Sequence, residues 1–116
     1  RADFSSHLIG WGSNPDGSHP LRNILATVTR EKGWGSSNRG RYSNPRLDAL
    51  LDQSLVELDE AKRVQLVIEA QRIAAEDVAV IPLHIQTNIW AMRRHLAHDA
   101  RNDELTRAQD VRPAAR

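Results

Sequence analysis

The stretch from Asn44 to Ile85 constrains the fold of this chain most strongly, because it predicts two helices followed by a buried strand. In its middle, apolar residues recur at helical spacing and polar residues fall on the opposite face, which predicts a helix over residues 60–77. Its apolar positions are Leu66, Val67, Ala70, Ile73 and Ala74. Asp59 is the expected N-cap, because its carboxylate can accept bonds from free backbone N–H groups. Lys62 stands where a capping box needs Glu or Gln, so no capping box is expected.

A second helix is predicted over residues 45–56, immediately before the first. Asn44 precedes a proline and is therefore biased away from helical geometry, so it suits the cap and Pro45 the first turn. Leucines recur along one face of this helix, at positions 47, 50, 51 and 55. Because only Glu57 and Leu58 separate the leucine-rich helix from the cap of the next one, we expect the two helices to lie close together.

Residues 78–85 follow the helices and are apolar at successive positions, which is typical of a strand covered on both faces. Pro82 removes one backbone donor and so predicts an edge or an irregularity at that point. His84 lies in this run and is expected to be packed and hydrogen-bonded. Residues 87–93 predict a second strand, the return of a hairpin.

The remaining segments give simpler predictions. Residues 4–11 predict a strand that enters a loop dense in Gly, Ser, Asn, Asp and Pro over residues 10–20. Pro20 then opens a helix predicted over residues 20–29, with Leu21, Ile24, Leu25 and Val28 on one face. Residues 30–43 form a second polar loop, and residues 95–116 are expected to be a surface-wrapping tail.

Composition limits the classes of function. The 116 residues carry a net charge of +1, so no general field attracts nucleic acid or acidic lipid. Residues 43–77 hold four basic and eight acidic groups, which gives the helical pair an acidic surface. The chain has no cysteine, so thiolate chemistry is excluded, and no apolar run is long enough to span a bilayer. No direct membrane insertion and no nucleic-acid partner are expected.

No catalytic or metal signature stands out. The sequence has no GxSxG motif, and GSSNRGR matches neither a Walker loop nor a Rossmann turn. His95 and His98 have His-x-x-His spacing but lack further ligands, so a solvated pair is expected. Trp11 and Trp34 lie beside glycines in loops, where a tryptophan either caps a core or lines a pocket. We expect no enzyme activity, no metal and no cofactor.

The ordered motifs of residues 4–94 resemble the C-terminal part of the family 5 extracellular solute-binding proteins, the dipeptide-, oligopeptide- and nickel-binding receptors of ABC importers. Four features carry the resemblance: Gly10-Trp11; Asn38 with YSNP at 42–45 and LDALL at 47–51; LDEAKRVQLVIEAQRIAAED at 58–77; and VIPL at 80–83 followed by Trp90 and Arg93-Arg94.

The resemblance implies an α/β fold, here an α+β fragment that forms the C-terminal portion of a two-lobed periplasmic-binding-protein-like receptor. Residues 1–116 would then be a single partial domain. Residues 1–19 would form the hinge and ligand loop, residues 20–94 helices and strands of the first lobe, and residues 95–116 the C-terminal tail. The missing partners of the 78–85 strand suggest that this segment does not fold cooperatively alone.

The resemblance also implies a ligand loop, formed here by Trp11, Gly12, Ser13, Asn14 and Asp16. In relatives an aspartate three residues after the tryptophan often pairs with a peptide ammonium. That position is Asn14, which argues against recognition of a free amino group. Asp16 is the alternative carboxylate. Trp90, in an apolar run, is expected to be structural.

The expected function is that of the substrate-binding component of an ABC transporter, periplasmic or extracellular, which binds a peptide or similar small solute and delivers it to a membrane permease. Nickel or another complexed nutrient is the alternative ligand within this class. A small helical protein–protein interaction module, docking through residues 44–77, is the alternative from a different class.

Overall fold

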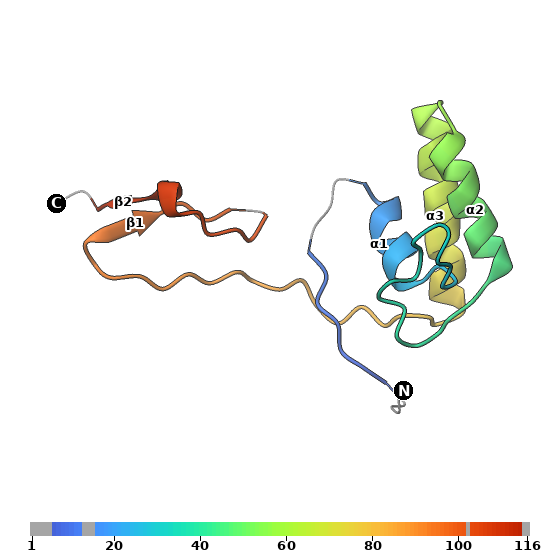
Figure 1. Ribbon diagram of the computed structural model, residues 1–116, viewed down its shortest axis with the longest axis horizontal. Helices are drawn as coiled ribbons and strands as arrows, with labels where there is room; N and C mark the ends of the chain where they lie inside the picture. The colour runs from blue at the N-terminus through green and yellow to red at the C-terminus, as the bar shows by residue number, and fades with distance from the viewer. Residues whose placement is uncertain (1–5, 13–15, 102, 115–116) are drawn as a thin grey trace. The chain divides into compact units, whose positions relative to one another are not determined.

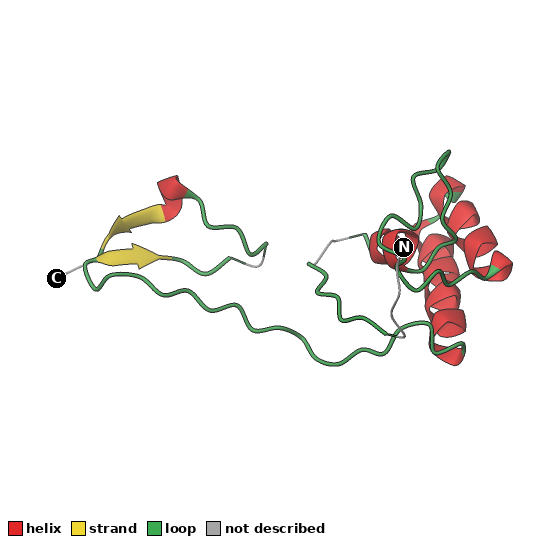
Figure 2. Cartoon of the chain, turned by 60° about the horizontal axis from the view of Figure 1, so that its bottom comes forward, coloured by secondary structure: helices red, strands yellow, loops and turns green. Residues whose placement is uncertain are grey.

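The computed structural model describes residues 6–12, 16–101 and 103–114, and it divides the chain into two compact units, Arg1–Pro82 and Leu83–Arg116. The described part of the first unit is helical, and the second contains a short antiparallel hairpin (Figure 2). The chain therefore mixes helix and strand, in agreement with the expected class. None of the helices in the described part of the chain has the length and apolar character needed to span a bilayer.

Helices α2 (Pro45–Val56) and α3 (Glu60–Glu76) pack side by side as a helical hairpin (Figure 1). Both predicted caps are confirmed, because Asn44 accepts bonds from the backbone N–H groups of Arg46 and Leu47, and Asp59 accepts one from Lys62. Arg72 lies 3.4 Å from Glu76, and its shorter bonds go to Glu69. These are exposed pairs, which contribute little to stability.

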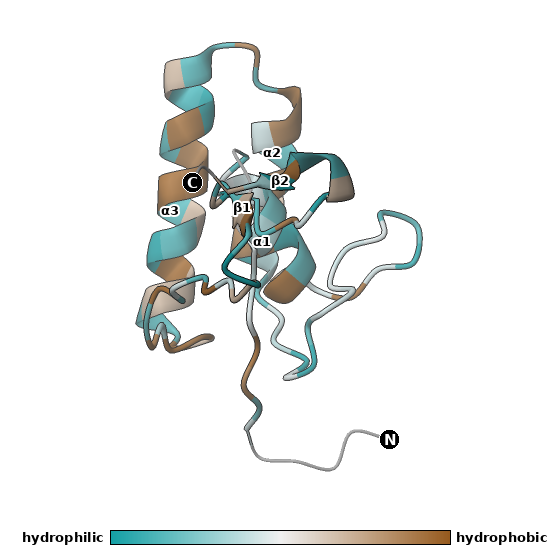
Figure 3. Cartoon of the chain, turned by 90° about the vertical axis from the view of Figure 1, so that its left-hand side faces the viewer, coloured by the Kyte–Doolittle hydropathy of each residue, from teal (hydrophilic) through white to brown (hydrophobic). Residues whose placement is uncertain are grey.

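The core of this unit lies where the three helices and the 26–38 loop meet. Its buried apolar residues are Leu21, Leu25, Ala26, Trp34, Leu47, Leu51, Ala70, Ile73 and Ala74. Leu55 was expected on the apolar face of α2, but half of its surface is exposed. It lies in the last turn of that helix. The ribbon of α3 carries apolar as well as polar bands (Figure 3), and Val64 and Ile68 remain nearly half exposed.

Helix α1 (Ser18–Ile24) begins earlier and ends five residues earlier than the predicted helix over 20–29. The β-branched run Thr27-Val28-Thr29 favours extended backbone, and Thr29 instead forms an isolated bridge with Trp34. Val28 was expected on the apolar face, yet it is 56% exposed. Local helical spacing therefore overestimated the length of this helix.

Asn38 organises the loop that leads into α2. Its buried side chain donates bonds to the carbonyl oxygens of Ala26 and Tyr42, at 3.0 and 2.7 Å, and accepts one from the Tyr42 N–H. Gly35 has a φ of +68°, and a Cβ atom there would lie 2.7 Å from the Ala26 oxygen. Only glycine fits this position without a backbone shift.

Helix α3 ends in a Schellman motif. The N–H of Ala79 bonds the carbonyl of Ala74, and the N–H of Val78 bonds that of Ala75. Val78 has a φ of +52°, a left-handed conformation that normally requires glycine. Beside it, Asp77 accepts bonds from the Tyr42 hydroxyl at 2.5 Å and the Asn44 amide at 2.7 Å.

The three predicted strands are wrong for the residues described. Residues 6–11 are irregular, residues 4 and 5 of that prediction lie outside the described residues, and residues 78–93 form an extended loop without strand pairing (Figure 2). A strand requires a neighbouring strand, and the described residues pair none with these segments. His84 was expected to be packed, but it is exposed.

In the second unit, β1 (Leu96–His98) pairs antiparallel with β2 (Val111–Pro113), and a short 3-10 helix, η1 (Ala108–Asp110), precedes β2. This hairpin lies in the segment expected to be a surface tail. It buries no apolar residue fully, and a two-bond ion pair between Arg112 and Asp99 joins its two sides. Ion pairs and a few backbone bonds therefore replace a core in the described part of this unit.

Candidate functional site

Asp16 bonds two residues of α1, Ser18 and Arg22. Its carboxylate accepts the Ser18 N–H at 2.9 Å, the Ser18 hydroxyl at 2.7 Å and the Arg22 guanidinium at 2.8 Å. Burial alone would raise the pKa of Asp16, but the Ser18 bonds and the Arg22 charge outweigh it and lower that pKa. Asp16 therefore bonds the first turn of α1 from the position before its N-cap, Gly17, and is held in its charged form.

Trp11 lies against the first turn of α1. The centroid of its ring system is 5.9 Å from that of the His19 imidazole, with a tilt of 41° between the planes. Trp11 is 38% exposed, so part of the indole stays open to a ligand. An exposed indole face held by a helix is a suitable surface for an apolar or planar ligand group.

Two nitrogens of α1 near this loop are enclosed without a hydrogen-bond partner, Nδ1 of His19 and Nε of Arg22. Buried polar groups are normally satisfied, so these two mark an unusual polar environment. His19 and Arg22 lie three positions apart and therefore share one face of α1. Trp11, Asp16 and this face of α1 form the described part of the candidate site.

The structure describes only part of the predicted ligand set. Trp11, Gly12 and Asp16 are described, and Gly12 is exposed. Ser13 and Asn14 lie outside the described residues. Sequence analysis did not identify His19 and Arg22, although the Asp-Gly-Ser sequence two residues before Pro20 is a helix-start signal that could have indicated them.

The other residues considered for binding have structural or surface positions. Trp34 is 7% exposed and belongs to the core, with the Lys32 ammonium 4.7 Å from its ring centroid. Trp90 is partly buried, donates to the Thr106 hydroxyl and stacks on His98 at 5.7 Å. The His-x-x-His spacing predicted a solvated pair of His95 and His98. That prediction is wrong for His98, which packs against Trp90. The described residues contain no cluster of three or more His, Asp or Glu side chains that could hold a metal.

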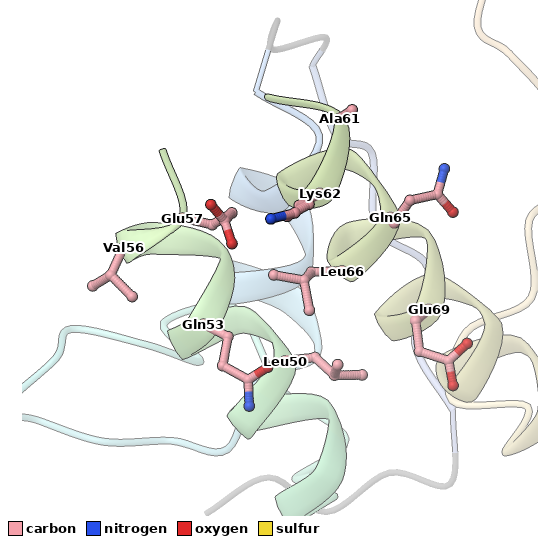
Figure 4. Close-up of a pocket in the computed structure, with 9 residues that line it drawn as sticks. All are labelled: Leu50, Gln53, Val56, Glu57, Ala61, Lys62, Gln65, Leu66 and Glu69. Carbon is pink, nitrogen blue, oxygen red and sulfur yellow. The ribbon is translucent and has the colours of Figure 1, made fainter. Parts of the chain in front are cut away.

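An open groove of about 800 Å³ lies between α2 and α3. Leu50 and Leu66 point into the space between the helices, and Glu57 and Lys62 lie near the helix connection (Figure 4). This is the surface that the interaction-module hypothesis would use. It combines apolar and charged groups without a pattern that specifies one ligand.

Comparison with known proteins indicates a distant relationship to a family 5 solute-binding protein. The relative is the oligopeptide-binding protein OppA of Bacillus subtilis (strain 168), and the two sequences are 33% identical over 94 residues. The aligned region covers 81% of this chain but only 16% of the length of that relative. No family model matches the chain. No solved structure matches it either.

Proposed function

We propose that this chain is part of the substrate-binding component of an ABC transporter, and that the complete protein binds a peptide or similar small solute for import. The similarity to an oligopeptide-binding protein over 94 residues carries the proposal. Its partners would be the solute and a membrane permease, and its location periplasmic or extracellular.

The proposal includes a two-lobed receptor that closes on its ligand. Residues 1–19 would supply the hinge and ligand loop, residues 20–94 part of the first lobe, and residues 95–116 the C-terminal segment. Residues 80–92 are irregular and unpaired in this chain, and in the longer receptor they would lie beside chain outside this sequence. Nickel or another complexed nutrient remains the alternative ligand within the class.

Within this receptor, the ligand loop would comprise Trp11, Gly12, Ser13, Asn14 and Asp16. The partly open indole of Trp11 supports a ligand contact. Asp16 contributes by setting the shape of the loop, because its carboxylate is bonded to Ser18 and Arg22.

Calorimetry on the full-length protein with trialanine and pentaalanine tests the function. We expect binding, and Trp11→Ala should weaken it by about 1–3 kcal/mol without lowering the melting temperature. Trp90→Ala is the matched control, since it removes a tryptophan that contacts Thr106 and His98, and it should leave the affinity unchanged. Absence of binding by both peptides, while nickel binds, would favour the alternative ligand.

A further inference from the structure

Helix α3 is apolar around more of its circumference than the packing of the described residues uses. Its buried residues Ala70, Ile73 and Ala74 face the core. A second apolar edge runs along the helix at spacings that place its members on one side of it. These members, all of them exposed, are Ala61, Val64, Ile68 and Ala75.

The polar side chains of α3 are concentrated elsewhere on its surface. A surface helix typically has one apolar stripe, and a helix that is apolar on more sides is normally buried. The pattern of α3 is therefore that of a helix covered on two sides. After the first turn, its polar residues occupy one strip, with Gln71 beside the second edge as the exception: Gln65, Glu69, Arg72 and Glu76.

In the described part of the chain, only the core side of α3 is covered. Helices α1 and α2 contact α3 on that side. Val64 and Ile68, which lie one helical turn apart on the second edge, expose 46% and 48% of their surface. Branched aliphatic side chains left half open to water are unfavourable unless another apolar surface covers them.

The side of the hairpin that carries the groove has the opposite character. Arg46 of α2 pairs with Glu69 of α3 at 2.8 Å, and Arg72 pairs with the same carboxylate oxygen. Lys62 and Gln65 also line this side (Figure 4). Removing such charges from water often costs more than their pairing returns. The groove side is therefore suited to solvent and not to an interior.

The similarity to the oligopeptide-binding relative spans 16% of its length, so on the proposed function most of the receptor lies outside this sequence. We propose that chain outside this sequence, in the same molecule, covers the edge formed by Val64 and Ile68 with an apolar surface, while the groove between α2 and α3 stays open to solvent. Helix α3 is then an interior helix of the receptor. This inference assigns the orientation of the helical hairpin, deepens the proposed function and rests on it.

Thiol labelling of the full-length protein tests which side of α3 is covered. Val64→Cys and Ile68→Cys place a smaller side chain on the second edge, and Gln65→Cys, on the groove side of the same turn, is the matched control. Residues 1–116 contain no other cysteine. Alkylation by iodoacetamide is followed by mass spectrometry of the peptides that hold these positions, with the rate in urea as reference. Circular dichroism checks that the variants fold.

We expect the thiols at positions 64 and 68 to react at least about 100-fold more slowly than the thiol at position 65, because reaction requires local opening of the covered edge. Equal rates at the three positions, whether fast or slow, would overturn the inference. Slow reaction at 64 and 68 that becomes fast on dilution of the protein would also overturn it, because a second copy would then be the cover.

Peptide binding by the same variants separates the two proposals. A protein that binds trialanine while its thiols at 64 and 68 react freely contradicts only the orientation of α3. A protein in which these thiols are protected, and which binds neither trialanine nor pentaalanine, contradicts only the peptide-binding function.

Discussion

Replacing Val78 by glycine should stabilise the helical unit by about 1 kcal/mol. The left-handed conformation costs an L-residue roughly 1–2 kcal/mol, and Val78 has a φ of +52° as the residue after the C-cap of α3. Glycine removes this strain but adds about 0.5–1 kcal/mol of conformational entropy to the unfolded chain. The valine side chain is 64% exposed, so little burial is lost.

Urea denaturation of the full-length protein, followed by circular dichroism at 222 nm, measures the effect. The hydrogen bonds that end α3 involve only backbone atoms of residues 74, 75, 78 and 79, so Val78→Gly keeps them. Val80→Gly is the matched control: Val80 is not among the described residues with positive φ, and this variant should be neutral or destabilising. If both variants destabilise the unit equally, the argument from strain is wrong.

Three further substitutions probe the loop before α2. Gly35→Ala should destabilise the unit by at least about 2 kcal/mol in urea denaturation, through strain plus the 2.7 Å contact. Gly33→Ala, with the same sign of φ and open space around it, should show the strain alone, and equal losses would contradict the steric term. Tyr42→Phe should lower stability at neutral pH by about 1 kcal/mol. Burial and Asp77 raise the pKa of Tyr42 to about 12, above its ordinary value of 10.0. Its contribution is therefore complete below pH 10 and lost as the pH rises through 12, and denaturation curves of the variant should lack that alkaline loss.

The contact between Tyr42 and Asp77 also makes the stability of the unit depend on pH in the acid range, where stability falls as the pH falls. Bonds from Tyr42 and Asn44 lower the pKa of Asp77 below 3.8. A depressed folded-state pKa contributes stability above the ordinary value, and this contribution disappears as the pH falls through the folded value. Tyr42→Phe should weaken the acid limb as well, because it removes one of the two bonds.

The features that were predicted correctly depend on short-range chemistry. The N-caps at Asn44 and Asp59 bond residues two or three positions away, so the sequence alone identifies them. The predicted C-terminal end of α1 was wrong because the Thr29–Trp34 bridge competes with the helix. Apolar spacing does not reveal that bridge. The bond between the Tyr42 hydroxyl and the Asp77 carboxylate spans 35 residues, so local patterns do not reveal it either.

In the candidate site, too, the sequence reveals the local features and not the contacts between distant residues. Loop composition placed Trp11 and Asp16 in a loop, because glycine and polar residues mark the loop directly. Their contact with a ligand is implied by the family resemblance and stays a prediction. The ion pair with Arg22 connects residues six apart across a helix start, and only the structure shows that it satisfies Asp16. The hairpin of β1 and β2 was missed because its strands have three residues each and are joined by Arg112 and Asp99 across the turn.

The apolar segment 78–92 provides the last test of the proposed architecture. Its large aliphatic residues are mostly open to solvent: Ile81, Leu83, Ile85 and Ile89 are 67–96% exposed. Exposure on this scale is unfavourable at about 25 cal/mol per Å² of apolar surface. If these residues form a strand in the sheet of a longer receptor, their backbone N–H groups are paired there and unpaired in the chain of 116 residues. Hydrogen exchange followed by mass spectrometry should then show strong protection of residues 80–90 in the full-length protein and rapid exchange in the shorter chain. Rapid exchange in both proteins, with α3 protected in both, would refute the strand and the two-lobed arrangement that requires it.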